Sequence, residues 1–327
     1  MAMCPVCCGE NTQSRITVSA AAAASHFISQ AEDRPRHIEL VAHIAKLWKG
    51  DQSKLMECRN CQFGFAWPYI AGDAAFYNLA YPRSGYPAMK WEFKRTMAAW
   101  VPSRGAILEV GAGDGFFLDL ARRAVKDIGP IFATEYYDGA VERLRGKGYS
   151  PVHGDVRSHF TDGQKFDAIF MFQVLEHMDG VAELFDKLAN LMNVGGDLFV
   201  AVPNKARTQF NEDNGSLLDC PPNHIGRWTD RTFLVLADRF GFRLVKAEIE
   251  PFSALTFVKQ DLHYSHRRRS QLGGLAGRVR SIRNEKLRRA AIVAETLLHA
   301  PTRLPVWFKA TRRGDLGNAL WGHFQKI

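Results

Sequence analysis

The sequence predicts an α/β fold in which helices cover both faces of a doubly wound, seven-stranded sheet. From residue 105 onward, short apolar runs alternate with segments whose apolar residues recur at helical spacing. That alternation is typical of a parallel sheet with crossover helices. The first apolar run, Ile107–Val110, leads directly into Gly111, Gly113 and Gly115. Polar residues follow the next runs, at the edge of the sheet where open α/β folds bind their ligands.

The elements can be assigned in chain order. The apolar runs predict strands at 107–110, 131–135, 149–153, 166–172 and 197–202, with helices at 116–124, 139–147, 181–191 and 229–240. Thr229 is a plausible cap for the last of these helices, and Gly241 a plausible stop. Residues 243–250 and 253–259 are expected to pair as the two final strands.

The glycine-rich turn indicates a binding site. Gly111, Gly113 and Gly115 occupy alternate positions, and Phe116 begins a helical pattern. Glycine lets the backbone turn tightly and approach a ligand closely, and the N–H groups that open a helix point at such a ligand. The dinucleotide fingerprint requires its third glycine at position 116, where this chain has phenylalanine.

Three further strand ends carry candidate ligand-binding residues. Glu135 ends the second strand, where its carboxylate can accept hydrogen bonds from both hydroxyls of a ribose. Asp155 follows the third strand and can accept the amino group of adenine, while Val156 can pack on the ring. The fourth strand leads into Gln173-Val-Leu-Glu-His177. Four such features in order indicate one nucleoside site.

The charge and length of the chain divide it into three parts. Residues 260–327 hold 14 Lys and Arg against 4 Asp and Glu, whereas the rest of the 327-residue chain holds 29 against 30. We therefore predict an N-terminal unit at 1–80, a catalytic domain at 81–259 and a basic tail at 260–327. No apolar run reaches the roughly 18 residues of a membrane span, and no charged-then-apolar leader opens the chain. A cytoplasmic protein is expected.

Two C-x-x-C pairs predict a metal site in the N-terminal unit. Cys4, Cys7, Cys58 and Cys61 provide the four thiolates of a tetrahedral structural zinc site, as in a zinc ribbon. The alternative is that the two pairs are unrelated buried or free cysteines. Between them, apolar residues at helical spacing over 37–49 predict one helix packed on the ribbon.

Residues 105–259 resemble the class I S-adenosylmethionine-dependent methyltransferases, which have a Rossmann-like fold. The resemblance rests on Leu108-Glu109-Val110 before the glycines, on Val174-Leu-Glu-His177, and on Gly195-Gly196 before the fifth strand. It implies that S-adenosylmethionine is the cofactor. The cofactor-binding residues that it implies are Glu109, Gly111, Gly113, Gly115, Glu135, Asp155, Val156 and Gln173.

With the cysteine pairs included, residues 1–259 resemble the subgroup with an N-terminal zinc-binding segment, which methylates deoxysugars, glycans and natural products. A hydroxyl acceptor needs a general base, and histidine is the side chain most readily poised near neutral pH. His224 and His177 are the candidates. Related deoxysugar C-methyltransferases carry Tyr-His-Glu-His where this chain has Pro221-Pro222-Asn223-His224. That difference favours O-methylation of a sugar or glycan intermediate over C-methylation.

Two other functions remain open at this stage. A zinc segment before a methyltransferase domain also resembles some ribosomal RNA methyltransferases, and a basic tail suits RNA. Against RNA, the ribbon and catalytic domain together are nearly neutral, so a nucleic-acid partner is the less favoured alternative. A non-catalytic zinc-ribbon interaction module is disfavoured because every expected cofactor position is filled.

The basic tail predicts an amphipathic helix. Apolar residues recur at roughly helical intervals among arginines between 271 and 299. Such a helix can lie on an anionic membrane surface, with Trp307, Phe308 and Trp321 as interfacial anchors. This would make the enzyme peripheral to the inner face of the membrane. The alternative is a tail that folds back on the catalytic domain or on a partner subunit.

Overall fold

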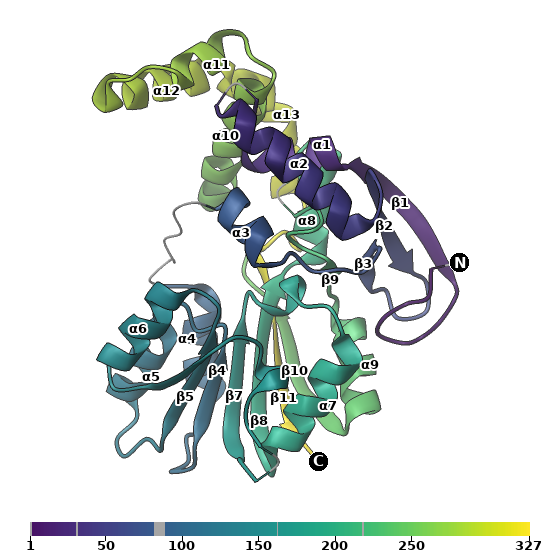
Figure 1. Ribbon diagram of the computed structural model, residues 1–327, viewed down its shortest axis with the longest axis vertical. Coiled ribbons are helices and arrows are strands. Elements are labelled where there is room, and N and C mark those ends of the chain that lie inside the picture. The colour runs from purple at the N-terminus through teal and green to yellow at the C-terminus, as the bar shows by residue number, and fades with distance from the viewer. Residues whose placement is uncertain (1, 31, 82–88, 162, 218) are drawn as a thin grey trace.

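The larger of two sheets organises the protein. The computed structural model describes residues 2–30, 32–81, 89–161, 163–217 and 219–327. Seven strands lie in the order β10-β11-β8-β7-β4-β5-β6 (Figure 1). Their bounds are β4 Ile107–Val110, β5 Ile131–Glu135, β6 Ser150–His153, β7 Phe166–Phe172, β8 Met192–Pro203, β10 Phe242–Ile249 and β11 Ala319–Lys326.

The strand order confirms the predicted fold. The first five of these strands are parallel and lie side by side as β6-β5-β4-β7-β8. The direction of winding reverses at β4, which is the switch point where Rossmann-like sheets bind ligands. β11 runs antiparallel to both β8 and β10, so the sheet is mixed. The fold is a Rossmann-like α/β fold with a mixed seven-stranded sheet.

Helices cover both faces of this sheet, as the alternating pattern predicts. On one face pack α4 (Trp91–Ala99), α5 (Phe116–Ala124) and α6 (Asp138–Gly146), and on the other α7 (Val181–Leu191) and α9 (Asp230–Phe240). The end signals of α9 are confirmed: the Thr229 side chain accepts a hydrogen bond from the Thr232 N–H, and Gly241 is left-handed.

The last strand of the sheet was predicted in the wrong place. Residues 253–259 begin a helix, α10 (Ala254–Gln271), because the Ser253 side chain caps it by accepting from the Thr256 N–H. The seventh strand is β11, formed by the final residues of the chain. The predicted basic tail therefore re-enters the sheet and is not helical throughout.

The segment between β10 and β11 is a group of helices, which we call the helical insertion (254–311). After α10 come α11 (Gly274–Arg280), α12 (Glu285–His299) and α13 (Leu304–Thr311). The single helix predicted over 271–299 is thus divided. Gly273, at positive φ, separates α10 from α11, which begins at Gly274, and the Asn284 side chain caps α12.

The N-terminal part forms a second, antiparallel sheet. Its order is β1-β2-β3-β9, with bounds β1 Thr12–Ser19, β2 Gln52–Cys58, β3 Gly64–Trp67 and β9 Gly226–Arg227. Where one helix was predicted there are two, α1 (Ala20–Phe27) and α2 (Arg34–Trp48), because the alanine run 20–24 is itself helical. A short helix, α3 (Ala74–Ala80), follows β3. The fourth strand, β9, comes from the catalytic domain, and α8 (Lys205–Asp213) precedes it.

The two sheets share one hydrophobic core. One buried cluster contains residues of both parts: Val6, Phe63 and Phe65 from the N-terminal part, and Trp228 and Phe233 from the catalytic domain. The rings of Phe63 and Trp228 are 4.4 Å apart between centroids. Within the described residues, no helix is long and apolar enough to cross a membrane.

Trp321 was predicted to be an interfacial anchor, and this is wrong. It lies in β11, is fully buried, and its indole N–H donates to the Thr96 hydroxyl at 2.9 Å.

We expect Trp321→Ala to lower the free energy of unfolding by about 3–5 kcal/mol, because removal of a large buried side chain leaves a cavity. Urea denaturation measures this. Phe308→Ala, at an exposed ring, is the control and should change stability by less than about 0.5 kcal/mol. Equal effects would contradict the placement of β11.

Candidate functional site

A cleft of about 1430 Å³ opens at the carboxyl ends of the parallel strands. Its floor is formed by residues that follow β4, β5, β6 and β7. Its roof comes from the segment 70–81, which includes α3 and contributes Tyr77 and Tyr81. Of the ten residues predicted for the cofactor and catalysis, nine line this cleft: Glu109, Gly111, Gly113, Glu135, Asp155, Val156, Gln173, His177 and His224.

The glycine turn after β4 requires its glycines. Gly111, Gly113 and Gly115 all have positive φ, between 55° and 75°. A Cβ on Gly111 would come within 2.4 Å of Val174, and a Cβ on Gly115 within 2.7 Å of Leu144. Gly115 begins α5, set against Leu144, whereas the first two glycines face the cleft. The turn therefore brings bare backbone to the edge of the cleft.

Two buried carboxyl groups flank the turn. The carboxylate of Glu135 accepts hydrogen bonds from the backbone N–H groups of Gly113 (2.7 Å), Tyr136 (2.8 Å) and Tyr137 (3.1 Å). Glu109 is 3% exposed, and its Oε2 has no hydrogen-bond partner among the described residues. Burial raises the pKa of Glu109 well above its usual range. An unpartnered oxygen of this kind is ready for a donor or a cation from a ligand.

Asp155 is held by its neighbours at the end of β6. Arg157 donates to it from its backbone N–H at 2.8 Å and from Nε and Nη2 at 2.9 and 2.6 Å. The Tyr136 hydroxyl donates at 3.1 Å. Although burial alone would raise the pKa of Asp155, the hydrogen bonds from Arg157 outweigh it and lower that pKa. An adenine amino group would have to displace one of these donors, so that role stays a prediction. Val156 is fully buried beside it.

Gln173 directly follows β7 and has a strained conformation. Its φ is +59°, a region that residues other than glycine rarely adopt. Its backbone N–H donates to the Ala201 carbonyl at 2.7 Å, and its side-chain amide donates to Glu92 at 3.1 Å. These bonds hold the turn that follows, so that His177 comes to face the cleft.

The two candidate histidines meet at the other end of the cleft. Their ring centroids are 4.6 Å apart in a T-shaped arrangement. His177 lies 2.6 Å from the Asn223 carbonyl through Nδ1. A carbonyl can only accept, so Nδ1 carries the proton and Nε2 is left with its lone pair. Burial, with the charge of His224 adding to it, lowers the pKa of His177 to about 3.

His224 has a different environment because of Asp219. The two side chains are 2.8 Å apart, from Nδ1 to Oδ1. Burial alone would lower the pKa of His224, but the hydrogen bond to Asp219 and its charge, with a contribution from Glu176, raise it overall. The same pairing lowers the pKa of Asp219 against the effect of its own burial. His224 is thus an imidazole with Nδ1 fixed and Nε2 available, the orientation of a general base.

Glu176 completes this group beneath the histidines. It is 1% exposed, its Oε2 is unpartnered among the described residues, and burial raises its pKa to about 7. One ligand atom from each of Glu176, His177 and His224 lies within 4.8 Å of the others, which is also compatible with a bound metal ion. The Tyr77 hydroxyl oxygen is 3.1 Å from His177 Nδ1, so α3 contacts the same group.

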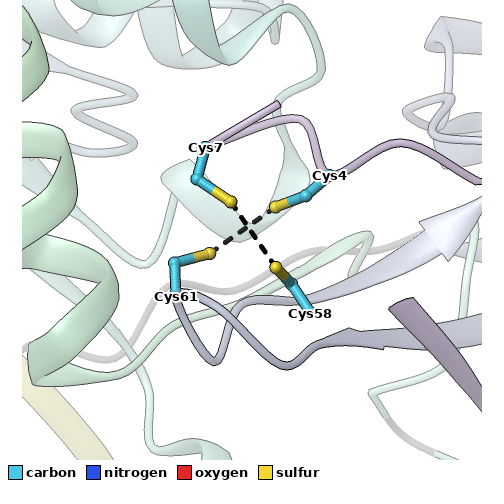
Figure 2. Close-up of side chains that lie close together, drawn as sticks. All are labelled: Cys4, Cys7, Cys58 and Cys61. Carbon is cyan, nitrogen blue, oxygen red and sulfur yellow. Dashed lines mark hydrogen bonds between the residues drawn. The ribbon is translucent and has the colours of Figure 1, made fainter. Parts of the chain in front are cut away.

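The four predicted cysteine ligands come together at a second site (Figure 2). Cys4 and Cys7 lie in the N-terminal turn, Cys58 ends β2, and Cys61 lies in the turn that follows, with their sulfur atoms pointing at one another. The Sγ atoms of Cys4 and Cys61 are 3.5 Å apart, as are those of Cys7 and Cys58. All four sulfurs lie within 4.8 Å of one another. Tetrahedral zinc, with Zn–S bonds of about 2.3 Å, places its sulfurs about 3.8 Å apart.

The comparison with known families agrees with the fold and the cleft. Residues 87–247 match a family model described as a methyltransferase domain. The protein is an S-adenosylmethionine-dependent methyltransferase. No curated protein matches the sequence significantly.

Solved structures similar to this methyltransferase share little of its sequence. A methyltransferase from Archaeoglobus fulgidus is 17% identical, with a TM-score of 0.49 over 78% of this chain and 100% of the other. One from Mesorhizobium loti is 12% identical, with a TM-score of 0.46 over 73% and 100%. The geranyl diphosphate C-methyltransferase from Streptomyces coelicolor A3(2) is 11% identical, with a TM-score of 0.43 over 72% and 78%.

The residues of the methyltransferase fit its cofactor. The bare glycine turn and the N-terminus of α5 can receive the carboxylate of the methionine part. The unpartnered oxygen of Glu109 can receive a cationic group, since S-adenosylmethionine carries an ammonium and a sulfonium. Glu135 and Asp155 lie on the strand ends beyond, where a nucleoside would extend.

Sequence reasoning missed part of the site. Asp219 lies five residues before His224 in a loop, and nothing in that spacing distinguishes it from a surface acid. Arg157 and Tyr136 were also missed, because their partner Asp155 was assigned to the ligand. Tyr77 and Tyr81, by contrast, could be singled out from the sequence as an i, i+4 pair able to close over a cofactor, and both line the cleft.

We expect Glu135→Ala to weaken binding of S-adenosylhomocysteine by about 10- to 100-fold. A buried charged hydrogen bond is worth about 1.5–3 kcal/mol, and the N–H groups now held by Glu135 would lose their acceptor. Isothermal calorimetry measures the affinity. The control is Asp138→Ala, at a 92% exposed carboxylate three residues away, which should bind normally. Unchanged affinity in a folded Glu135→Ala variant would exclude Glu135 from the site.

Elemental analysis of anaerobically purified protein tests the cysteine cluster. We expect one zinc ion per chain, its loss in Cys61→Ser, and retention in Cys8→Ser, since Cys8 is exposed and outside the cluster. Trp228 is fully buried and shares a core with the cysteines, so its fluorescence should shift to the red when the metal is lost. Metal-free protein would refute this site. Two ions per chain would place the second at Glu176, His177 and His224.

Proposed function

We propose that this methyltransferase O-methylates a sugar or glycan intermediate, with His224 as the general base and a structural zinc ion at the four cysteines. The observation that carries the proposal is the Asp219–His224 pair beside the cleft. O-methylation differs from transfer to a thiolate or a carbanion because a hydroxyl must lose a proton as it reacts. A histidine that is oriented by a buried carboxylate supplies that function.

The contrast between the two histidines supports His224 over His177. His177, with a pKa of about 3, is a poor proton acceptor near neutral pH. His224 has a raised pKa, so it can hold a proton taken from the acceptor. His177 packs edge-on against His224 and is itself fixed by the Asn223 carbonyl. We therefore assign it a positioning role.

The size and lining of the cleft support a polar acceptor. At about 1430 Å³ the cleft exceeds the ~300–1,000 Å³ of a typical single-ligand pocket, which leaves room for an acceptor beside the cofactor. The roof over the histidines presents the rings of Tyr77 and Tyr81 and the polar side chains of Asp73 and Asn78. Aromatic faces and hydrogen-bonding groups together suit a sugar.

The roles of the residues in the reaction follow from this placement. When bound, S-adenosylmethionine supplies the activated methyl group. Glu109, Glu135 and the glycine turn hold one end of the cleft in a fixed geometry, and orientation is the larger part of catalysis in such a transfer. The acceptor's hydroxyl proton passes to His224 Nε2, and the adjacent Asp219 stabilises the resulting imidazolium. General bases contribute about 10²–10⁴-fold to the rate.

Incubation of the purified enzyme with labelled methyl donor and a panel of acceptors tests the proposal. The panel contains sugar nucleotides, lipid-linked glycans, small phenolic natural products and ribosomal RNA. We expect label in the sugar or glycan arm, on oxygen, with His224→Ala reducing turnover about 10²–10⁴-fold and leaving S-adenosylhomocysteine affinity unchanged. Label in RNA, or on carbon, would refute the proposed acceptor.

The pH dependence gives a separate test of Asp219. His224 must be neutral to act as a base, so activity rises with pH as His224 loses its proton. Asp219 raises that pKa, so Asp219→Asn should move the acidic limb of the kcat/KM profile to lower pH and reduce the maximum rate. The control is Asp179→Asn, a half-exposed carboxylate on the same cleft, which should leave the limb in place. If the acidic limb of the profile stayed at the same pH in Asp219→Asn, a group other than His224 would be responsible for it.

A further inference from the structure

We propose that the helical insertion is a docking surface for an anionic membrane, with the outer face of α12 as its apolar contact. The inference goes beyond the methyl-transfer reaction and does not depend on the identity of the acceptor. It rests on three observations: which face of α12 is buried, how the charges of the insertion are paired, and where the insertion joins the sheet.

The first observation is that α12 turns its apolar face away from the protein. Four of its five large apolar side chains are exposed, Leu287 by 59%, Val293 by 57%, Leu297 by 63% and Leu298 by 66%, and the fifth, Ile292, is half-buried. Among the described residues, Glu295 is the only buried member of this helix. A helix that packs on a core normally does the opposite, so the outer face of α12 is built for contact with something apolar.

The inner face of α12 explains this orientation. The Glu295 carboxylate faces α10, where Arg269 contacts it at 2.8 Å and His266 at 2.5 Å. These bonds lower the pKa of Glu295 to about 2, although its burial opposes them. A polar contact therefore fixes the inner side of α12. The apolar side is left for another partner, and α11 and α12 project from the body of the molecule (Figure 1).

The second observation concerns charge. Residues 254–311 carry 12 Lys and Arg against 3 Asp and Glu. All three acids are already paired: Asp261 with Arg303, Glu285 with Arg289, and Glu295 with Arg269. Arg283 and Lys286, at the start of α12, are exposed beside the apolar face. Exposed apolar residues flanked by cations are the features of a helix that lies in the interface of an anionic bilayer.

The positive charge of the insertion also favours a membrane over a second copy of the chain as its partner. A symmetric dimer through α12 would bring the same basic surface of two chains together, and like charges at an interface oppose association. Phe308, in α13, is a further exposed apolar residue of the insertion, at 57%. Arg312 lies over its ring at 3.9 Å. An aromatic ring next to a cation suits the boundary between lipid headgroups and acyl chains.

The third observation is that the insertion lies on the same edge of the sheet as the cleft. β10 runs in the direction of β8, so Ile249 ends at the carboxyl edge, where Leu320 pairs with it. α10 and α11 are then held against the N-terminal part. The Arg267 guanidinium donates to the Phe27 carbonyl at 2.9 Å, and Arg280 pairs with Glu32 at 2.8 Å. A membrane bound by α12 therefore lies toward the edge on which the cleft opens.

Co-sedimentation of the full-length enzyme with vesicles tests the inference, without any methyl acceptor. We expect binding to equal mixtures of phosphatidylcholine and phosphatidylglycerol, weak binding to phosphatidylcholine alone, and weaker binding as salt is raised. Each basic residue near an anionic surface contributes about fivefold. Arg283→Glu with Lys286→Glu should therefore reduce affinity at least about tenfold. Leu297→Gln with Leu298→Gln should do so too, by removing the apolar contact.

Matched controls come from the opposite edge of the sheet. Arg104→Glu changes an 87% exposed arginine before β4, and Val194→Gln changes an 82% exposed valine near the start of β8. Both should bind vesicles like the unaltered enzyme. Three results would overturn the inference: equal binding to neutral and anionic vesicles, no effect of the α12 variants, or a dimer that only the Leu297/Leu298 variant loses in analytical ultracentrifugation. Binding to RNA but not to vesicles would reassign the surface.

Discussion

The packing of Phe63 on Trp228 joins the two parts of this protein, and the site depends on it. Trp228 follows β9, the strand that the catalytic domain adds to the small sheet, and Phe63 follows the cysteine turn. The chain that leaves β3 is thereby led over the cleft. There the Tyr69 hydroxyl donates to the Met178 carbonyl and the Ala71 N–H to the Asp179 carboxylate. The N-terminal part therefore both carries the cysteine cluster and supplies, through segment 70–81, the roof of the methyl-transfer cleft.

Short-range signals explain what could be predicted from the sequence. The parallel strands are continuous apolar runs, because they are buried on both faces, and β4, β5 and β7 have the predicted bounds. The glycine turn and the cap at Thr229 depend only on residues that are close together in the chain, so both could be predicted. The cysteine pairs were recognisable because metal ligands have characteristic spacing.

The parts that could not be predicted depend on contacts between distant segments. Residues 319–326 are a strand because β8 and β10 both pair with them, and the run ALWGHFQK offers no local sign of this. Residues 253–259 are apolar enough for a strand, but the Ser253 cap makes them helical. The partnership of Asp219 with His224 likewise exists only in the folded loop, where burial of both side chains makes it strong.

The two histidines of the site, His177 and His224, differ in basicity because they have different hydrogen-bond partners. His177 donates to a neutral carbonyl and loses its basicity through burial, whereas His224 donates to a carboxylate and gains it. Glu176, which lies close to both, is fully buried, and this burial raises its pKa to about 7.

The helical insertion leaves and re-enters the sheet at adjacent points, and this has a consequence for how such a protein can vary. The Glu250 N–H donates to the Ala319 carbonyl at 2.8 Å, so the sheet holds the two ends of the insertion together, while α10 and α11 also bond to the N-terminal part. A segment closed in this way is thermodynamically a long loop, and the entropy of closing a loop grows only slowly with its length. The outer helices α11 and α12 can thus be lengthened or shortened while β10 and β11 stay paired, whereas Phe257 and Ala310 belong to a buried cluster with Phe210. The segment proposed for docking and the residues of the methyl-transfer cleft therefore lie in separable stretches of one chain.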